Sequence, residues 1–221
     1  MKENIGSFKS KQVEKLLNLI KGLKENKAVR GLVNRRLGEF RRLKESSGNE
    51  IFKELCFCLL TANFNAERSI RIQHELGEAF LKESESKLAE ELKRLGHRYP
   101  KTRAKYIVEA RKPMEAVIEA VRSPNDHEKV REWLVRNIRG LGYKEASHFL
   151  RNIGYKDLAI LDFHVLDILE KYGVIKKPKT LTKRKYLEIE EKLRCLAKKL
   201  GLTLAELDLY LWYLETGKIL K

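Results

Sequence analysis

Apolar residues recur at helical spacing along almost the whole chain. The clearest apolar stripes lie near its two ends and consist of Val13, Leu16, Leu17 and Ile20, and of Leu187, Ile189, Leu193 and Leu196. A stripe with this spacing covers the face of an α-helix that packs against a core. The alternation of apolar and polar positions that marks a strand is nearly absent, and turn-forming clusters at 46–49 and 123–126 separate the helical stretches. The pattern predicts an all-α fold.

Composition narrows the class of protein without identifying a function. The 221 residues are 35% charged, and no apolar run approaches the roughly 18 residues that cross a bilayer, so we expect no membrane segment. Residues 1–6 lack the basic and then apolar profile of a secretory leader, which predicts a cytoplasmic protein with reduced thiols. Because Cys56, Cys58 and Cys195 are few and widely spaced, we expect neither a metal site nor a disulfide framework.

The charge balance favours a nucleic-acid partner. Lys and Arg number 47 against 31 Asp and Glu, which gives a formal net charge of +16 and a pI near 9.7. Such an excess of positive charge attracts phosphate backbones. A heat-adapted protein also carries many charged residues on its surface, but this alternative explains their abundance and not their imbalance.

The most informative segment, 134–150, has the pattern of a helix, a tight turn and a second helix. Gly140 and Gly142 stand in the turn with one apolar residue between them. Glycine accepts positive φ and has no side chain, so the backbone of such a hairpin can approach another molecule closely. The amides of the turn and of the next helix's first turn, together with the helix dipole, would bind a phosphate whatever the base sequence. An ordinary turn between two helices is the alternative, and the net charge favours DNA binding.

Lys144 and Asp162 are the candidate catalytic residues. Lys144 falls in the first turn of the second helix, where the positive end of the helix dipole favours a free amine over an ammonium. A free amine that attacks C1′ of a deoxyribose expels the base and leaves a Schiff base, from which β-elimination breaks the strand. Asp162 closes an apolar run, where it either stabilises positive charge on the sugar or caps a helix. A lysine at such a position is more often simply solvated, and a histidine such as His164, which could donate to a phosphate, is more often packed or solvated.

These residues together resemble the helix-hairpin-helix DNA glycosylase superfamily. The hairpin with Lys144, the segment 161–166 and the segment 208–214 narrow the resemblance to the archaeal-type (type 2) 8-oxoguanine DNA glycosylase/AP lyases. The resemblance implies that Lys144 forms the Schiff base, that Asp162 is the assisting carboxylate, and that His164 lies near the phosphate beside the lesion.

The resemblance also implies how the chain is organised and what it binds. It implies two helical subdomains with the active site in the cleft between them. We expect one subdomain at 51–152, which ends in the helix-hairpin-helix at about 134–150, and the other at 1–50 plus 153–221. The expected partner is duplex DNA that contains 8-oxoguanine or an abasic site, bound by a monomer that uses neither a metal nor a cofactor.

Three residues near the middle of the chain take a DNA-binding role through the resemblance. Asn63 would fill the gap left when the damaged nucleotide is flipped out of the duplex. Arg68 and Tyr99 would lie near the base that has lost its partner. Considered without the resemblance, these residues form a polar and aromatic patch after a predicted helix at 51–60, as in a capped loop.

Three residues near the end of the chain would form the pocket for the flipped base. Trp212 would provide the face on which the base stacks, Lys221 would help to recognise 8-oxoguanine, and Asp208 would accept a hydrogen bond from the guanine edge. Without the resemblance, Trp212 would be assigned to the core and Lys221 to a frayed terminus.

Two other functions fit part of these observations. One is a glycosylase and lyase that acts on another oxidised base, and the other is a non-catalytic helix-hairpin-helix module that only binds DNA. Superfamily members that act on oxidised pyrimidines often carry a four-cysteine iron–sulfur cluster after the hairpin, whereas this sequence has Cys195 alone in that region. The single cysteine disfavours an endonuclease III-like protein.

Overall fold

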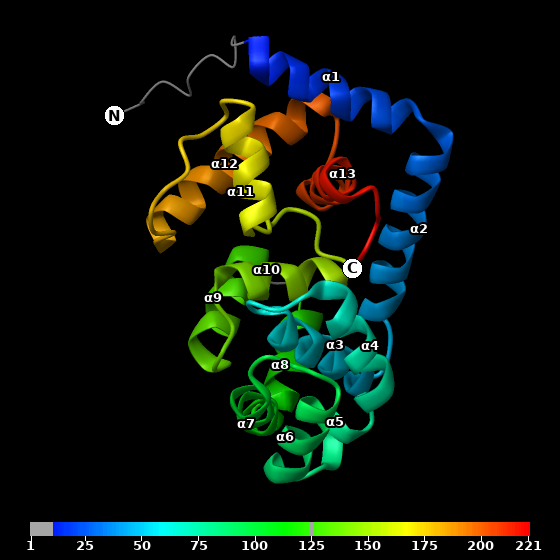
Figure 1. Ribbon diagram of the computed structural model, residues 1–221, viewed down its shortest axis with the longest axis vertical. Helices are drawn as coiled ribbons and strands as arrows, with labels where there is room; N and C mark the ends of the chain where they lie inside the picture. The colour runs from blue at the N-terminus through cyan, green and yellow to red at the C-terminus, as the bar shows by residue number, and fades with distance from the viewer. Residues whose placement is uncertain (1–10, 124–125) are drawn as a thin grey trace. The chain divides into compact units, whose positions relative to one another are not determined.

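The computed structural model describes residues 11–123 and 126–221, and in these ranges all regular structure is helical (Figure 1). The predicted all-α fold is therefore confirmed. The helices are α1 Lys11–Glu25, α2 Lys27–Lys44, α3 Gly48–Thr61, α4 Ala66–Leu76, α5 Ala79–Lys82, α6 Glu85–Arg94, α7 Pro100–Arg111, α8 Met114–Arg122, α9 His127–Asn137, α10 Tyr143–Asn152, α11 Phe163–Lys171, α12 Lys183–Leu200 and α13 Leu204–Thr216. Within the described ranges, no helix is both long and apolar enough to span a membrane. The expectations for residues 1–6 and for 124–125 lie outside the described residues.

The chain divides into two compact units. The first, here called the terminal unit, comprises Lys156–Ile219 with the described part of Met1–Gly38. The second, here called the hairpin unit, comprises Glu39–Tyr155 with Leu220–Lys221. The two last residues of the sequence thus pack in the hairpin unit, although the residues before them belong to the terminal unit. The expected subdomain boundaries at 51 and 152 stay a prediction.

The terminal unit is built from α1, the first part of α2 (27–38), α11, α12 and α13. The residues of α1 that enter its core belong to the predicted stripe and are Val13, Leu16 and Ile20. The stripe predicted on α12 needs a correction, because Leu187 is exposed and Tyr186 is buried in its place. Residues three or four apart share a helix face, and Tyr186 has this spacing from Ile189, whereas Leu187 does not.

Helix α3 forms the centre of the hairpin unit, where it packs against α4, α5, α7, α8 and α10. Ser47 caps its first turn by accepting a hydrogen bond from the backbone N–H of Glu50. From Ile51 to Thr61 every residue except Lys53 is buried, which is the burial pattern of a central helix. Glu54 stands out in this segment, because it is a carboxylate and is only 3% exposed.

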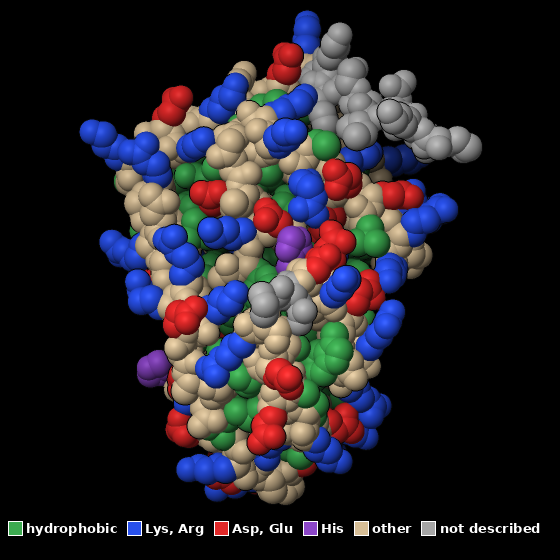
Figure 2. Space-filling view, turned by 180° about the vertical axis from the view of Figure 1, so that it is seen from behind, with side chains coloured by type: hydrophobic (Ala, Val, Ile, Leu, Met, Phe, Trp, Pro, Cys, Tyr) green, Lys and Arg blue, Asp and Glu red, His purple; other side chains and the backbone are tan. Residues whose placement is uncertain are grey.

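On the face drawn in Figure 2, Lys and Arg side chains lie all across the surface rather than in one patch, with Asp and Glu side chains between them. The net charge of +16 therefore provides a general attraction for phosphate backbones. Local geometry, and not the charge alone, must identify the residues that contact a partner.

Candidate functional site

The turn between α9 and α10 requires glycine at one of its two glycine positions. Gly140 has a φ of 92°, and a Cβ atom at this position would lie 2.3 Å from Cδ2 of Tyr106 on α7. Gly142 has a φ of −90°, which any residue adopts. The expectation of positive φ is thus correct for Gly140 and wrong for Gly142. Gly142 is the N-cap residue of α10, and because it has no side chain the first amides of the helix are not covered by a capping group.

Gly140→Ala is expected to destabilise the protein by about 2–4 kcal/mol, because alanine would be strained in the left-handed region and would collide with Tyr106. For a chain of this length, Tm should fall by about 5–15 °C. Gly142→Ala is the matched control and should cost less than about 1 kcal/mol, since its Cβ would meet only the flexible end of Glu145, at 3.2 Å. Thermal unfolding followed by circular dichroism measures both variants, and equal midpoints would contradict this description of the hairpin.

Lys144 is the second residue of α10, in the first turn as predicted. Its side chain is 23% exposed, and its Nζ atom lies 3.6 Å from Oε1 of Glu145. No side chain caps the helix, because the N-cap residue is Gly142. The first amides of a helix have no partner within the helix, so Lys144 stands beside backbone donors that favour negative charge.

A buried arginine braces the two helices of the hairpin. Arg131 on α9 is 1% exposed, and its guanidinium donates a hydrogen bond to Oγ of Ser147 on α10 at 3.2 Å. The guanidinium also lies 5.1 Å from the ring centre of Tyr143. Sequence reasoning missed this brace because a charged residue on an amphipathic helix is usually solvated. The available signal was the position of Arg131 directly after Val130, at the edge of the apolar stripe of α9.

Asn63 lies in a strained turn directly after α3. It has a φ of 57° and is the one residue other than glycine with positive φ among those described. Its side chain is exposed, and Arg103 of α7 holds the turn by donating a hydrogen bond to the carbonyl of Ala62 at 2.6 Å. Arg68 is exposed in the first turn of α4, whose N-cap is Asn65. Left-handed backbone at an asparagine is often found at functional sites.

His97 connects the turn of Asn63 to Tyr99. Its Nδ1 atom accepts a hydrogen bond from the backbone N–H of Tyr99 at 3.0 Å, so the proton sits on Nε2, which donates to the carbonyl of Leu60 at 3.1 Å. Burial lowers the pKa of His97, and the charge of Arg103 acts in the same direction, which keeps the ring neutral in this arrangement. The tyrosine side chain is 37% exposed. The structure therefore places Asn63 and Tyr99 on one connected support.

Asp162 is the N-cap of α11, as the cap interpretation predicts. Its Oδ1 atom accepts a hydrogen bond from the backbone N–H of Val165 at 2.8 Å. One carboxylate oxygen suffices for this bond, and the side chain is only partly buried. Capping therefore does not prevent the carboxylate from also acting on a positive charge.

Two aromatic side chains of the terminal unit meet beside this cap. The rings of His164 and Trp212 are nearly perpendicular, with centres 5.1 Å apart. The Nε1 atom of Trp212 is buried and has no hydrogen-bond partner in the described structure. Phe163 lies against His164 with ring centres 4.0 Å apart and is 64% exposed. An aromatic surface therefore lies next to Asp162.

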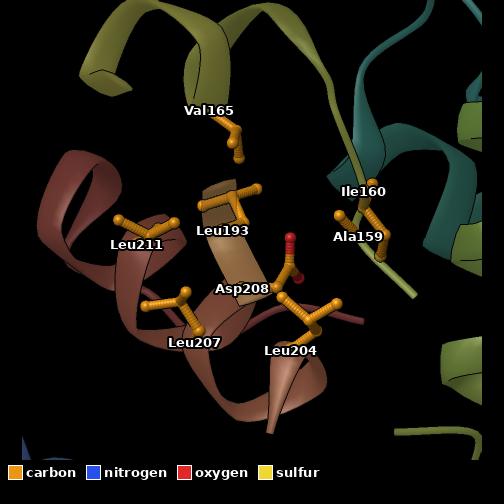
Figure 3. A pocket seen from close by; sticks show the side chains of 8 residues that line it. All are labelled: Ala159, Ile160, Val165, Leu193, Leu204, Leu207, Asp208 and Leu211. Carbon is orange, nitrogen blue, oxygen red and sulfur yellow. The ribbon is translucent and has the colours of Figure 1, made fainter. Parts of the chain in front are cut away.

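Asp208 and Trp212 lie one turn apart on the same side of α13. Figure 3 shows the Asp208 carboxylate pointing into a small pocket. The other lining residues are all apolar and are Ala159, Ile160, Val165, Leu193, Leu204, Leu207 and Leu211. Val165 lines this pocket and also donates its backbone N–H to Asp162. The four predicted site residues of the terminal unit therefore lie where α13 meets the start of α11, and they are Asp162, His164, Asp208 and Trp212.

The predicted site residues fall into one group in each unit. The hairpin unit holds Asn63, Arg68, Tyr99, Gly140, Gly142, Lys144 and Lys221, and the terminal unit holds Asp162, His164, Asp208 and Trp212. In the hairpin unit, the Lys221 ammonium lies 2.7 Å from Oε2 of Glu54 and 4.3 Å from the ring centre of Phe57. That Lys144 and Asp162 face one cleft stays a prediction.

The cysteines of the hairpin unit lie inside α3. Burial raises the pKa of Cys56 and of Cys58 well above the ordinary value, which keeps both thiols protonated and makes them poor nucleophiles. Both are free, as is Cys195. Among the described residues, no group of three or more His, Cys, Asp or Glu side chains is placed to hold a metal ion.

Known proteins resemble this chain over nearly its whole length. The profile of a family described as 8-oxoguanine DNA glycosylase matches residues 33–202. A Korarchaeum cryptofilum protein named 8-oxoguanine DNA glycosylase/AP lyase is 52% identical over 210 residues, which cover 95% of this chain and 99% of the relative. A Methanocaldococcus jannaschii protein of the same name is 52% identical over 206 residues, covering 92% and 99%.

Solved structures of such proteins are similar as well. The crystal structure of the M. jannaschii 8-oxoguanine glycosylase/lyase in complex with a 15mer DNA containing 8-oxoguanine has a TM-score of 0.91 and 50% sequence identity, and covers 94% of this chain and 100% of that one. The crystal structure of the 8-oxoguanine DNA glycosylase of Thermotoga maritima has a TM-score of 0.89 and 46% identity, and covers 94% and 99%.

Proposed function

The chain belongs to the 8-oxoguanine DNA glycosylase family, and from that premise we propose that it excises 8-oxoguanine from duplex DNA and cleaves the strand at the abasic site. The observation that carries the proposal is Lys144, which follows the Gly140 hairpin in the first turn of α10. A lysine beside a phosphate-binding hairpin brings an amine close to the backbone of DNA. In the cell we place this activity in the cytoplasm, with chromosomal DNA as the substrate.

Lys144 acts as the nucleophile. Its neutral Nζ attacks C1′ of the damaged nucleotide, the bond from C1′ to the base breaks, and the base leaves with the bonding electrons and takes up a proton. The sugar ring then opens to a protonated Schiff base between C1′ and Nζ. Loss of a proton from C2′ expels the 3′ phosphate, which breaks the strand by β-elimination. The scheme requires neither a metal nor a cofactor.

Asp162 stabilises the sugar while the base departs. Positive charge develops on the deoxyribose in that step, and a fixed carboxylate nearby lowers its energy. The bond from Oδ1 to the N–H of Val165, at 2.8 Å, fixes the orientation of this carboxylate. His164, two residues further along α11, donates to the phosphate beside the lesion.

The flipped base enters a pocket whose polar groups come from the end of the chain. Trp212 offers its ring as the stacking face, Asp208 accepts from the guanine edge, and Lys221 donates to the oxidised base. Enzymes that act on a base take it out of the stack and read it through such stacking and hydrogen bonds. The perpendicular contact with His164 supports Trp212 as a fixed platform.

Asn63 takes the place of the flipped nucleotide in the duplex. Its exposed side chain stands on a turn that Arg103 holds through the carbonyl of Ala62. Tyr99 and Arg68 lie near the base that has lost its partner, and the amides at Gly140 and Gly142 bind a phosphate. A rigid support suits an inserted residue, because a side chain that is already ordered in the free protein loses less conformational entropy on binding.

A panel of lesion-containing duplexes tests the proposed function. Single-turnover excision should be fastest for 8-oxoguanine, compared with other oxidised purines and with oxidised pyrimidines, and strand cleavage should follow. Cleavage of a pyrimidine lesion at a higher rate would show a different base specificity. Binding that weakens with salt but is never followed by excision or cleavage would show a DNA-binding module.

A further inference from the structure

Glu54 is a carboxylate buried in the middle of α3, and no step described so far uses it. It is 3% exposed and is followed by seven buried residues, 55–61. Burying a charge costs free energy unless its partners compensate. The hydrogen-bond partners of Glu54 therefore indicate which group compensates, and is held by, the buried carboxylate.

Both oxygens of Glu54 are hydrogen-bonded. Oε1 accepts from Nδ2 of Asn152 at 2.6 Å, and Oε2 accepts from Nε2 of Gln73 at 3.1 Å and from Nζ of Lys221 at 2.7 Å. Two of these partners are neutral amides. Among the three partners, the Lys221 ammonium alone carries a charge that compensates the buried carboxylate.

The Lys221 ammonium is held from three sides within the hairpin unit. It donates to Glu54 and to Oε1 of Gln73, and it lies 4.3 Å from the ring centre of Phe57. Its side chain is 18% exposed. An ammonium has three N–H donors; among the described residues two of them have acceptors, Glu54 and Gln73, and the third can donate to another molecule.

The backbone of Lys221 is held as well. Burial lowers the pKa of His148 well below the ordinary value, and the charges of Arg151 and Lys144 act in the same direction. The hydrogen bond between His148 and the backbone of Lys221 acts in the opposite direction and is a smaller effect. The neutral His148 ring is thus hydrogen-bonded to the backbone of Lys221, and the Glu54 carboxylate is hydrogen-bonded to its ammonium. A lysine at the end of a chain is ordinarily frayed and mobile, whereas this one is fixed at both its backbone and its ammonium.

We propose that Glu54, assisted by Gln73, is a positioning residue that holds the Lys221 ammonium where its remaining N–H reads the flipped base. The inference rests on the proposed function, in which Lys221 recognises 8-oxoguanine. Without Glu54, the long Lys221 side chain can adopt many rotamers. Only a few of these rotamers place its N–H donor toward the base, so recognition becomes less effective. An abasic site has no base to recognise, so its cleavage by Lys144 does not depend on this arrangement.

The test compares two single-turnover rates in the full chain, excision of 8-oxoguanine and cleavage of a preformed abasic site. Glu54→Gln is expected to slow excision about tenfold or more while abasic-site cleavage stays within about twofold. Lys221→Met should slow excision similarly, and adding Glu54→Gln to it should slow excision no further, because the two residues act as one unit. Glu50→Gln, the same change on an exposed residue one turn earlier on α3, is the matched control and should alter neither rate.

Three results would overturn the inference. They are an unaltered excision rate in Glu54→Gln, an equal loss of excision and abasic-site cleavage, and an additional loss when Glu54→Gln is combined with Lys221→Met. If Glu54→Gln does not fold, Gln73→Met removes the second acceptor of the ammonium and must show the same selective loss, to a smaller degree. A failure of the proposed function is distinguishable, since the unaltered protein would then not excise 8-oxoguanine at all.

Discussion

Lys144→Gln is expected to slow strand cleavage at an abasic site by at least about 10³-fold. Glutamine has nearly the length of lysine, but its amide is not a nucleophile and forms no Schiff base. The fold should persist, because Lys144 is partly exposed and its ion pair with Glu145, at 3.6 Å, contributes at most about 1 kcal/mol. A denaturing gel of an end-labelled duplex with one abasic site measures the rate.

Lys129→Gln is the matched control for this change. Lys129 is exposed on α9, in the same unit, so the substitution removes the same unit of positive charge. Loss of one phosphate contact slightly weakens DNA binding and slightly reduces its salt dependence. Cleavage rates are therefore measured at saturating protein, where all the DNA is bound and weaker binding does not lower the rate. Cleavage by Lys144→Gln at a rate near that of Lys129→Gln would exclude Lys144 as the nucleophile.

Asp162→Asn is expected to slow the excision of 8-oxoguanine by about 10²–10³-fold, because the carboxylate charge that stabilises the departing sugar is lost. Asparagine is as good an N-cap as aspartate, so the bond to the N–H of Val165 and the stability of the protein should be kept. Binding of the lesion duplex, measured by fluorescence anisotropy, should change little. The loss should therefore appear in the chemical step.

Asp162→Ala separates the two roles of this residue. Alanine removes both the charge and the cap, and should cost about 1 kcal/mol of stability beyond its effect on excision. If Asp162 only caps α11, Asp162→Asn should excise at the normal rate and Asp162→Ala alone should be impaired. Equal losses of binding and excision in Asp162→Asn would contradict a role of the carboxylate in the chemical step.

Local features of the chain were predictable from the sequence because they depend on neighbours along it. The apolar stripe of α1, the cap at Asp162 and the left-handed glycine at 140 all follow from spacing and from the conformational freedom of single residues. The error at Leu187 has the same origin, since an apolar run of mixed spacing does not specify which residue faces inward. Trp212 and Lys221 entered only through the resemblance, because nothing in their local sequence differs from a core aromatic and a terminal lysine.

Buried charges were not predictable, because their partners are distant in the sequence. Glu54 meets Lys221 across 167 residues, and Arg103 meets the carbonyl of Ala62 across 41. A charged residue on a helix is normally solvated, so the local sequence alone does not indicate that either residue is buried. The signal at Glu54 was its place at the start of an apolar run, where a carboxylate is costly unless a cation comes to it.

The central claim is that an amine of this protein, the Nζ of Lys144, becomes covalently joined to the sugar of 8-oxoguanine-containing DNA. Borohydride reduction during the reaction converts the Schiff base into a stable amine, and mass spectrometry of the digested adduct locates the modified lysine. We expect a reduced adduct on the peptide that contains Lys144 and none in Lys144→Gln. An adduct on another lysine, or one of equal yield in Lys144→Gln, would contradict the account.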